Sequence, residues 1–254
     1  MVDKEKIKEN IESNPLFYVK NVLLETTNIC NYSSIHRMCP INRFKEKIIL
    51  PLDIIERIIK ELKEYNFSGD FYPFCYSEPL IDPRMFKIFE LMKENLPLSR
   101  ICLYTNGLTL NETMIEELVK FGVHRVNISI YSEKEGIYFR PITVKYRDDK
   151  RIIIRAYKRY PMAEKMNDKL DWLENKPLNL SKPCRAPYEY LTINSYGEVV
   201  ICCHDWKRIH VLGNLNKSSL KEILTNKETI EMYTDLLEGK RSKYLLCSHC
   251  YKRR

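Results

Sequence analysis

Four cysteines in the last third of the chain have the types and spacing of a metal centre. Cys247 and Cys250 form a Cys-x-x-Cys pair, and Cys184 and Cys202 precede them. Four soft thiolates can close a tetrahedral zinc site or hold the irons of an iron-sulfur cluster. The pattern therefore predicts a metal centre in this part of the chain, with zinc and an iron-sulfur cluster as alternatives.

A second pair of cysteines lies near the other end of the chain. Cys30 and Cys39 stand in a polar loop that follows the apolar run 22–24, which reads as part of a strand. Two cysteine sites so far apart in one small protein predict two metal centres.

Composition limits the class of protein. The 254 residues can bury one large core or a core plus a small satellite domain, and we expect the second arrangement. The nine cysteines are an odd number, residues 1–20 lack a secretory signal pattern, and no apolar run reaches membrane-spanning length. We therefore expect a cytoplasmic protein with reduced thiols. The formal net charge of +8 is spread along the chain, so we expect a solvated surface and no membrane partner, with an anionic substrate or nucleic acid as the less expected alternatives.

Strand and helix patterns alternate over the first half of the chain. The expected strands are 22–27, 70–76, 101–104 and 126–131, and the expected helices are 52–65, 83–95 and 111–121. Such alternation predicts a parallel sheet with its functional residues at the C-terminal strand ends. Cys30, the turn 76–79, residues 105–107 and Ser129 should therefore meet at one edge.

The repeat is expected to break after residue 131. Only a short polar stretch precedes the β-branched run 151–157, too short for a helix with normal loops, so we expect a partial barrel. Two short strands, 191–194 and 198–202, and two short helices, 218–224 and 229–238, predict a small α+β domain after it. The expected division is an N-terminal helical extension over 1–19, a partial parallel TIM-like barrel over 20–160, a linker helix over 161–180, and an auxiliary domain over 181–254.

Several motifs occur in the order of a known family. Cys39 is preceded by Met and followed by Pro, Ser77-Glu78-Pro79 follows the second strand, and Thr105-Asn106-Gly107 ends the third. The tail adds Cys184, Gly197-x4-Cys202 and Cys247-x2-Cys250. On these motifs the chain resembles, over nearly its full length, a radical S-adenosylmethionine (SAM) enzyme with a C-terminal SPASM/twitch auxiliary cluster domain. The short chain, shortened barrel and four-cysteine tail are most similar in architecture to a dehydrogenase of that family that oxidises a hydroxyl.

The resemblance implies cofactors and partners. It implies SAM and two 4Fe-4S clusters, one in the N-terminal cysteine loop and an auxiliary one at Cys184, Cys202, Cys247 and Cys250. A 5'-deoxyadenosyl radical would abstract hydrogen from a small polar or peptide substrate, and the auxiliary cluster would take up the second electron. An electron donor of the flavodoxin or ferredoxin type is the implied protein partner.

The resemblance also assigns residues to SAM. The turn Tyr76, Ser77 and Glu78 would hold the methionyl amine. Asn106 and Ser129 would face the ribose or the carboxylate, and Arg155 would be the cation that meets the carboxylate. No general base is identified.

The cysteine loop departs from the family pattern. The family has Cys-x3-Cys-x2-Cys, whereas here eight residues separate Cys30 from Cys39 and the middle cysteine is missing. His36, Ser34 or Cys75 could supply the third ligand. We prefer His36, because it stands three residues before Cys39 and imidazole replaces thiolate on some clusters. The alternative is that this loop holds no intact cluster.

Two other functions remain open from the sequence. One is a peptide-modifying enzyme of the same family, although such enzymes usually carry an added recognition segment. The other is a catalytically degenerate or zinc-binding module that binds nucleic acid or protein, for which bound zinc and salt-sensitive binding would be the evidence.

Overall fold

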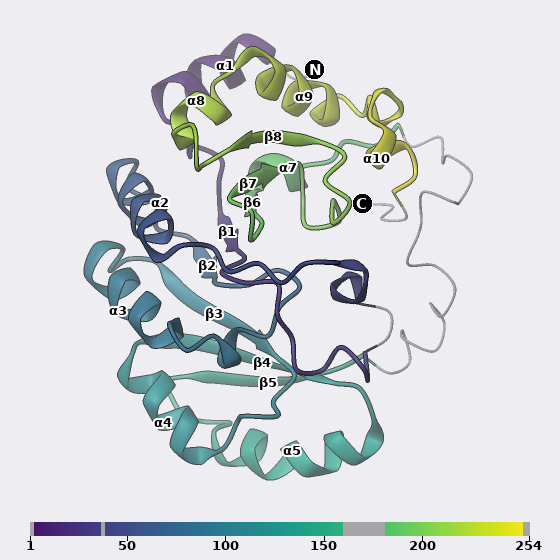
Figure 1. The fold of residues 1–254 in the computed structure, drawn as a ribbon. Coiled ribbons are helices and arrows are strands. Elements are labelled where there is room, and N and C mark those ends of the chain that lie inside the picture. The colour runs from purple at the N-terminus through teal and green to yellow at the C-terminus, as the bar shows by residue number, and fades with distance from the viewer. Residues whose placement is uncertain (1–2, 37–38, 160–180, 251–254) are drawn as a thin grey trace.

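Eight strands form one sheet in the order β5-β4-β3-β2-β1-β6-β7-β8 (Figure 1). The structure is a computed structural model that describes residues 3–36, 39–159 and 181–250, so the expected linker helix over 161–180 lies outside the described residues. β5 and β8 are the two edges of the sheet, which does not close. The expected partial barrel in an α/β fold is confirmed.

The first five strands are parallel, and helices connect them. The strands are β1 (Asn21–Leu24), β2 (Asp70–Tyr72), β3 (Arg100–Thr105), β4 (Val123–Ile130) and β5 (Ile153–Lys158). The helices are α2 (Leu52–Glu64), α3 (Met85–Asn95), α4 (Glu112–Lys120) and α5 (Glu133–Lys145). Figure 1 shows these helices along one face of β2 to β5. We call the opposite face of these strands the inner face.

The second strand is shorter than expected. β2 ends at Tyr72, because Pro73 follows and has no N–H with which to continue a ladder. Cys75 and Tyr76 therefore lie in an irregular turn rather than in the strand. A short 3-10 helix, η2 (Pro79–Ile81), follows them.

The expected break after residue 131 is wrong. Helix α5 fills the connection between β4 and β5, and β5 pairs in parallel with β4. The helix has little apolar periodicity, because it contains Gly136 and Pro141 and buries only Phe139. Ser132 caps its first turn. The strand-helix repeat therefore continues through five strands.

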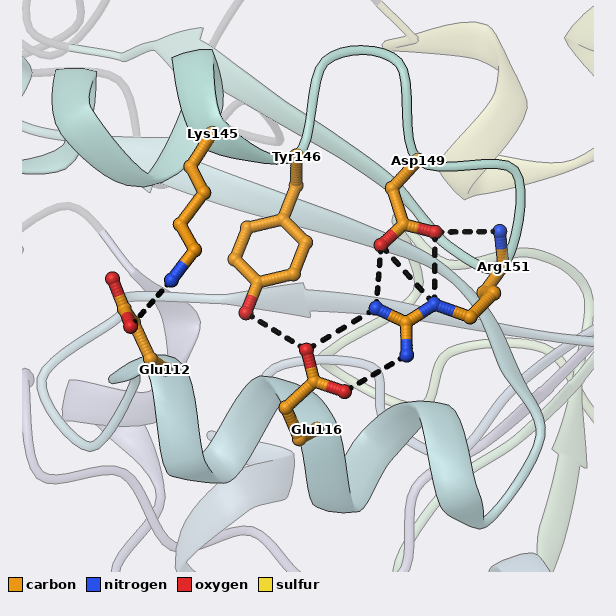
Figure 2. Close-up of polar contacts among 6 residues, drawn as sticks. All are labelled: Glu112, Glu116, Lys145, Tyr146, Asp149 and Arg151. Carbon is orange, nitrogen blue, oxygen red and sulfur yellow. Dashed lines mark hydrogen bonds and ion pairs between the residues drawn. The ribbon is translucent and has the colours of Figure 1, made fainter.

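A surface network marks the passage from α5 into β5 (Figure 2). Arg151 donates to both oxygens of Glu116 on α4 and pairs with Asp149 at 2.7 Å. The Tyr146 hydroxyl donates to Glu116 at 3.1 Å, and Lys145 lies 2.6 Å from Glu112. Exposed pairs of this kind contribute little to stability, so the network orients the loop more than it holds the helix.

The C-terminal part extends the same sheet. β6 (Tyr190–Ile193) pairs in parallel with β1, while β7 (Glu198–Val200) and β8 (Val211–Asn214) continue in antiparallel order. The helices of this part are α7 (Ala186–Glu189), α8 (Leu220–Leu224), α9 (Lys227–Leu237) and α10 (Leu245–Ser248), with the 3-10 turn η4 (Arg241–Lys243). Two further elements lie near the start of the chain, helix α1 (Lys4–Ser13) and the 3-10 turn η1 (Pro40–Arg43). In Figure 1, α1 lies beside α8 and α9 although it begins the chain. One apolar core runs from α1 through the sheet to α9.

Candidate functional site

The turn after β2 is tied to the end of β3 by one buried carboxylate. Glu78 accepts hydrogen bonds from the Thr105 hydroxyl at 2.7 Å and from the Asn106 N–H at 2.7 Å. Burial raises the pKa of Glu78, although these hydrogen bonds lower it. Its carboxylate oxygens are engaged within the protein, so Glu78 positions the turn rather than offering a free group to a ligand.

Asn106 links this turn to the cysteine loop. Its Nδ2 donates to Asn31 Oδ1 at 2.8 Å, immediately after Cys30 in the chain. The Cys39 thiol lies 3.9 Å from the carbonyl oxygen of Tyr76, which it faces as a donor. The structure thus brings both cysteines, the turn and Asn106 to one edge of the sheet, as parallel strand ends require.

Ser77 shows that this edge suits a polar ligand. The residue is 9 % exposed, and its hydroxyl has no hydrogen-bond partner among the described residues. Buried hydroxyls are almost always hydrogen-bonded, so an unpaired one at this turn fits a site for a polar cofactor. Ser129, 6 % exposed, lies at the end of β4.

The three alternatives for the missing ligand lie in different surroundings. The His36 ring stacks against Tyr131 with 4.6 Å between ring centres, and Ser34 is exposed. Burial raises the pKa of the Cys75 thiol well above its usual value, and Glu25, Cys203, Cys39 and Cys202 raise it further. Cys75 therefore lies within electrostatic range of both cysteine groups. The choice of His36 stays a prediction.

Four thiols gather in the C-terminal part. Cys247 belongs to a small apolar cluster with Ile201, Leu236 and Leu246, against which Cys184 and Cys202 pack. Burial, together with the neighbouring Cys184 and Cys250, raises the pKa of Cys247 to about 12. Soft thiols in an apolar setting form a donor set that fits an iron-sulfur cluster. Within residues 3–36, 39–159 and 181–250, no three His, Cys, Asp or Glu side chains converge as a single metal ion would require.

A pocket joins the turn after β2 to one of the C-terminal cysteines. Its lining includes Cys75 and Tyr76 from the turn after β2, Thr192 from β6, and Cys202 and Trp206 beyond β7. Thr192 is 1 % exposed, and its hydroxyl has no hydrogen-bond partner in the described part of the chain. The pocket therefore touches the turn proposed for SAM, an auxiliary thiol and an unsatisfied hydroxyl.

Glu25 is a candidate site residue that the sequence analysis missed. It follows β1, lines this pocket, and accepts hydrogen bonds from the Tyr76 N–H at 2.8 Å and the Ser195 N–H at 3.2 Å. Burial raises its pKa to about 7, against the lowering effect of those hydrogen bonds. The sequence signal that could have identified Glu25 is a carboxylate directly after an apolar strand. Asp205 also lines the pocket but accepts from the Ile209 and His210 N–H groups, so it shapes its own loop.

Arg155 in β5 and Arg159 just after it differ in position. Arg155 is exposed within the strand, in register with Asn127. Arg159 follows the strand, and its guanidinium lies 5.7 Å from the centre of the Tyr104 ring. Burial lowers the pKa of His36, and the charge of Arg159 lowers it further, so Arg159 lies close to the cysteine loop. The role of Arg155 in SAM binding stays a prediction.

Comparisons with known proteins agree with this geometry. The profile of the radical SAM superfamily matches residues 24–162, and that of an iron-sulfur cluster-binding domain (SPASM) matches residues 184–251. The S-adenosyl-L-methionine-dependent 2-deoxy-scyllo-inosamine dehydrogenase of Niallia circulans is 22 % identical over 233 residues, which cover 89 % of this chain and 90 % of that protein. No helix in the described residues is long and apolar enough to cross a membrane.

Solved structures show the same fold. The crystal structure of BtrN in complex with AdoMet and 2-DOIA superposes with a TM-score of 0.74 at 21 % identity and covers 92 % of this chain and 93 % of that one. Native anSMEcpe with bound AdoMet gives a TM-score of 0.58 at 14 % identity, over 92 % of this chain and 91 % of that one. The expected architectural similarity to a hydroxyl-oxidising dehydrogenase is confirmed at the level of the fold.

Proposed function

This chain belongs to the radical SAM superfamily and carries a SPASM iron-sulfur domain, so its cofactors are SAM and two 4Fe-4S clusters, and we propose that it is an oxidoreductase acting on a small polar substrate. When bound, these cofactors supply a radical that takes hydrogen from the substrate and an acceptor for the second electron. The observation that carries the proposal is the pocket that reaches from Tyr76 to Cys202.

The chain's own residues would hold the cofactors at opposite ends of this pocket. Cys30 and Cys39, with His36, Ser34 or Cys75 as third ligand, would hold the first cluster, and Cys184, Cys202, Cys247 and Cys250 the second. The turn at Tyr76 and Ser77 would hold the SAM amine, with Asn106 and Ser129 beside the ribose or carboxylate. Arg159 is closer to the cysteine loop than Arg155 and is the better cation for the SAM carboxylate.

The pocket would place the substrate between the two sites. Thr192 offers an unpaired hydroxyl there, and Trp206 and Tyr76 would exclude water from the reacting groups. The similarity to the dehydrogenase from Niallia circulans supports a small polar substrate. The protein would act in the reducing cytoplasm, with a flavodoxin- or ferredoxin-type protein as its electron donor. A peptide substrate is the alternative.

The metal content of anaerobically reconstituted protein tests the proposal. Wild type should hold about eight irons and form 5'-deoxyadenosine under dithionite, and Cys30→Ala/Cys39→Ala should hold about four irons and form none. Cys102→Ala is the control, because Cys102 is buried within β3 and pairs in register with Arg125 rather than lying at the strand end. Four irons in the wild type without cleavage of SAM would contradict the radical chemistry, and zinc in place of iron would favour a binding module.

A Ser77→Ala variant tests the SAM turn separately. Its hydroxyl makes no hydrogen bond within the described protein, so the variant should unfold at the wild-type temperature. If the hydroxyl binds SAM, the dissociation constant should rise about 5-fold, the value of one ordinary hydrogen bond. Isothermal titration and thermal unfolding measure the two effects. Unchanged SAM affinity would remove Ser77 from the cofactor site.

A further inference from the structure

The register of the sheet arranges the inner face in layers. Val126 and Ile128 of β4 belong to the apolar core on the helix side, so Arg125, Asn127 and Ser129 lie on the inner face. Cys102 pairs with Arg125, Tyr104 with Asn127, and Ser129 with Tyr157. Arg155 pairs with Asn127, which places Tyr104, Asn127 and Arg155 side by side in a middle layer.

In the layer nearest the N-terminal ends of the strands, one carboxylate is already paired with two arginines. Asp70 accepts from Arg100 at 2.6 Å and from Arg125 at 2.8 Å, and its partner Tyr72 also contacts Arg125 at 2.8 Å. Burial would raise the pKa of Asp70, but the two arginines lower it overall. This carboxylate is therefore matched by cations already and cannot neutralise a charge in the next layer.

The middle layer has two polar groups without partners. Asn127 is 1 % exposed, and its Oδ1 has no hydrogen-bond partner among the described residues, while its Nδ2 donates to the Leu103 carbonyl at 3.0 Å. Arg155 is exposed, and within the part that the structure describes no hydrogen bond or ion pair engages its guanidinium. Tyr104 lies 5.8 Å from both Phe74 and Tyr157 between ring centres, which provides an aromatic wall beside them.

Two arginines, Arg155 and Arg159, follow each other along this face, and SAM brings one carboxylate. Arg155 and Arg159 are four residues apart on an extended chain, which separates their backbones by about 13 Å. Arg159 follows the C-terminal end of β5, and its guanidinium lies 5.7 Å from the centre of the Tyr104 ring, so the SAM carboxylate would take Arg159 and leave Arg155 for another anion.

We propose that Arg155, Asn127 and the aromatic wall of Tyr104 bind the oxyanion and the ring of a substrate one layer below the SAM site, while its reacting hydroxyl extends into the pocket at Tyr76. The guanidinium fork matches a carboxylate or phosphate, Asn127 Oδ1 accepts from a hydroxyl or amine of the same molecule, and the rings pack on its planar part. This inference rests on the proposed function and names its substrate class as anionic. An aminocyclitol, which carries an ammonium group, would meet the wrong charge.

Charge-matched probes test the inference on reconstituted protein with SAM bound. 4-Hydroxyphenylacetate and phenyl phosphate carry an oxyanion on a ring, and tyramine and 2-deoxy-scyllo-inosamine carry an ammonium group. Calorimetry should show binding of at least one oxyanion and of neither amine. Arg155→Gln should weaken that oxyanion at least 10-fold and leave the SAM dissociation constant within 2-fold. Arg159→Gln should weaken SAM binding at least 10-fold and leave the dissociation constant of that oxyanion within 2-fold.

Three results would overturn the inference: amines that bind as tightly as the oxyanions, failure of both oxyanions, or an Arg155→Gln variant that loses SAM affinity. Its failure is distinguishable from failure of the proposed function. Wild type that forms 5'-deoxyadenosine but binds neither oxyanion refutes the substrate class alone. Protein that cleaves no SAM yet binds an oxyanion through Arg155 refutes the radical chemistry and supports the anion site.

Discussion

Glu25 touches both halves of the candidate site. Its carboxylate accepts from the backbone of the turn after β2 and from the backbone after β6, and both bonds satisfy donors in a buried region. A glutamine has only one acceptor oxygen and would turn its NH2 toward one of these N–H groups. Glu25 therefore positions Tyr76 relative to the auxiliary hairpin, which a glutamine with its single acceptor oxygen cannot do equally well.

The titration of Glu25 gives a pH-dependent prediction. Its pKa is raised from 4.5 to about 7 by burial, so between these values the folded chain keeps a proton that the unfolded chain has released. Stability from this group is therefore present below about pH 4.5 and is lost as pH rises through about 7. Glu25→Gln does not titrate, so between pH 5 and pH 8 its stability relative to wild type should improve by about 1–3 kcal/mol.

Urea unfolding at several pH values measures this difference. Glu9→Gln on the exposed side of α1 is the control, and its difference from wild type should stay constant with pH. A Glu25→Gln curve that runs parallel to wild type over the same range would show that the carboxyl is already ionised at pH 5.

At the scale of elements, α5 depends on one buried ring. Phe139 is 3 % exposed and lies where a Cβ on Gly107 would come within 2.4 Å of its ring. Gly107 also has φ of +80°, a conformation that favours glycine. The end of β3, with Asn106 beside Gly107, is thus shaped against α5 through Phe139.

Replacement of this ring should cost more than loss of the surface network. Phe139→Ala leaves a cavity and should lower the free energy of unfolding by about 3–5 kcal/mol. Arg151→Ala breaks only exposed contacts and should shift the unfolding midpoint far less. Arg151 makes several polar contacts in Figure 2, but exposed contacts of this kind contribute little to stability. Denaturant unfolding of both variants decides between them, and equal losses would mean that the network, not the ring, holds α5.

The same contrast explains what the sequence predicts and what it does not. Helices α2 to α4 were predicted because apolar residues such as Ile55, Ile58, Ile59 and Leu62 repeat at helical spacing. Helix α5 was missed because a single buried side chain gives no period. The motif order predicted which residues meet at the strand ends, but Glu25 and Arg159 have roles that depend on three-dimensional neighbours absent from any local pattern.

At the scale of the whole molecule, β1 joins two regions that the sequence analysis separated. β6 pairs with β1 over four residues, from Asn21 with Tyr190 to Leu24 with Ile193, and Leu191 is buried in the common core. The domain boundary expected at residue 181 stays a prediction from the sequence. In energetic terms, a continuous sheet and core should make the chain unfold as one unit.

Two probes of unfolding test this unity. Trp206 lies in the C-terminal part, and a Trp172→Phe background leaves it as the only tryptophan, so fluorescence reports that part while far-UV circular dichroism reports the whole chain. Both denaturation curves should coincide. Leu191→Ala should move both midpoints together, with a loss of about 2–5 kcal/mol, because its cavity lies in the shared core. If fluorescence alone moved, the auxiliary part would fold independently, and the carboxylate of Glu25 would bridge two separable bodies rather than two edges of one.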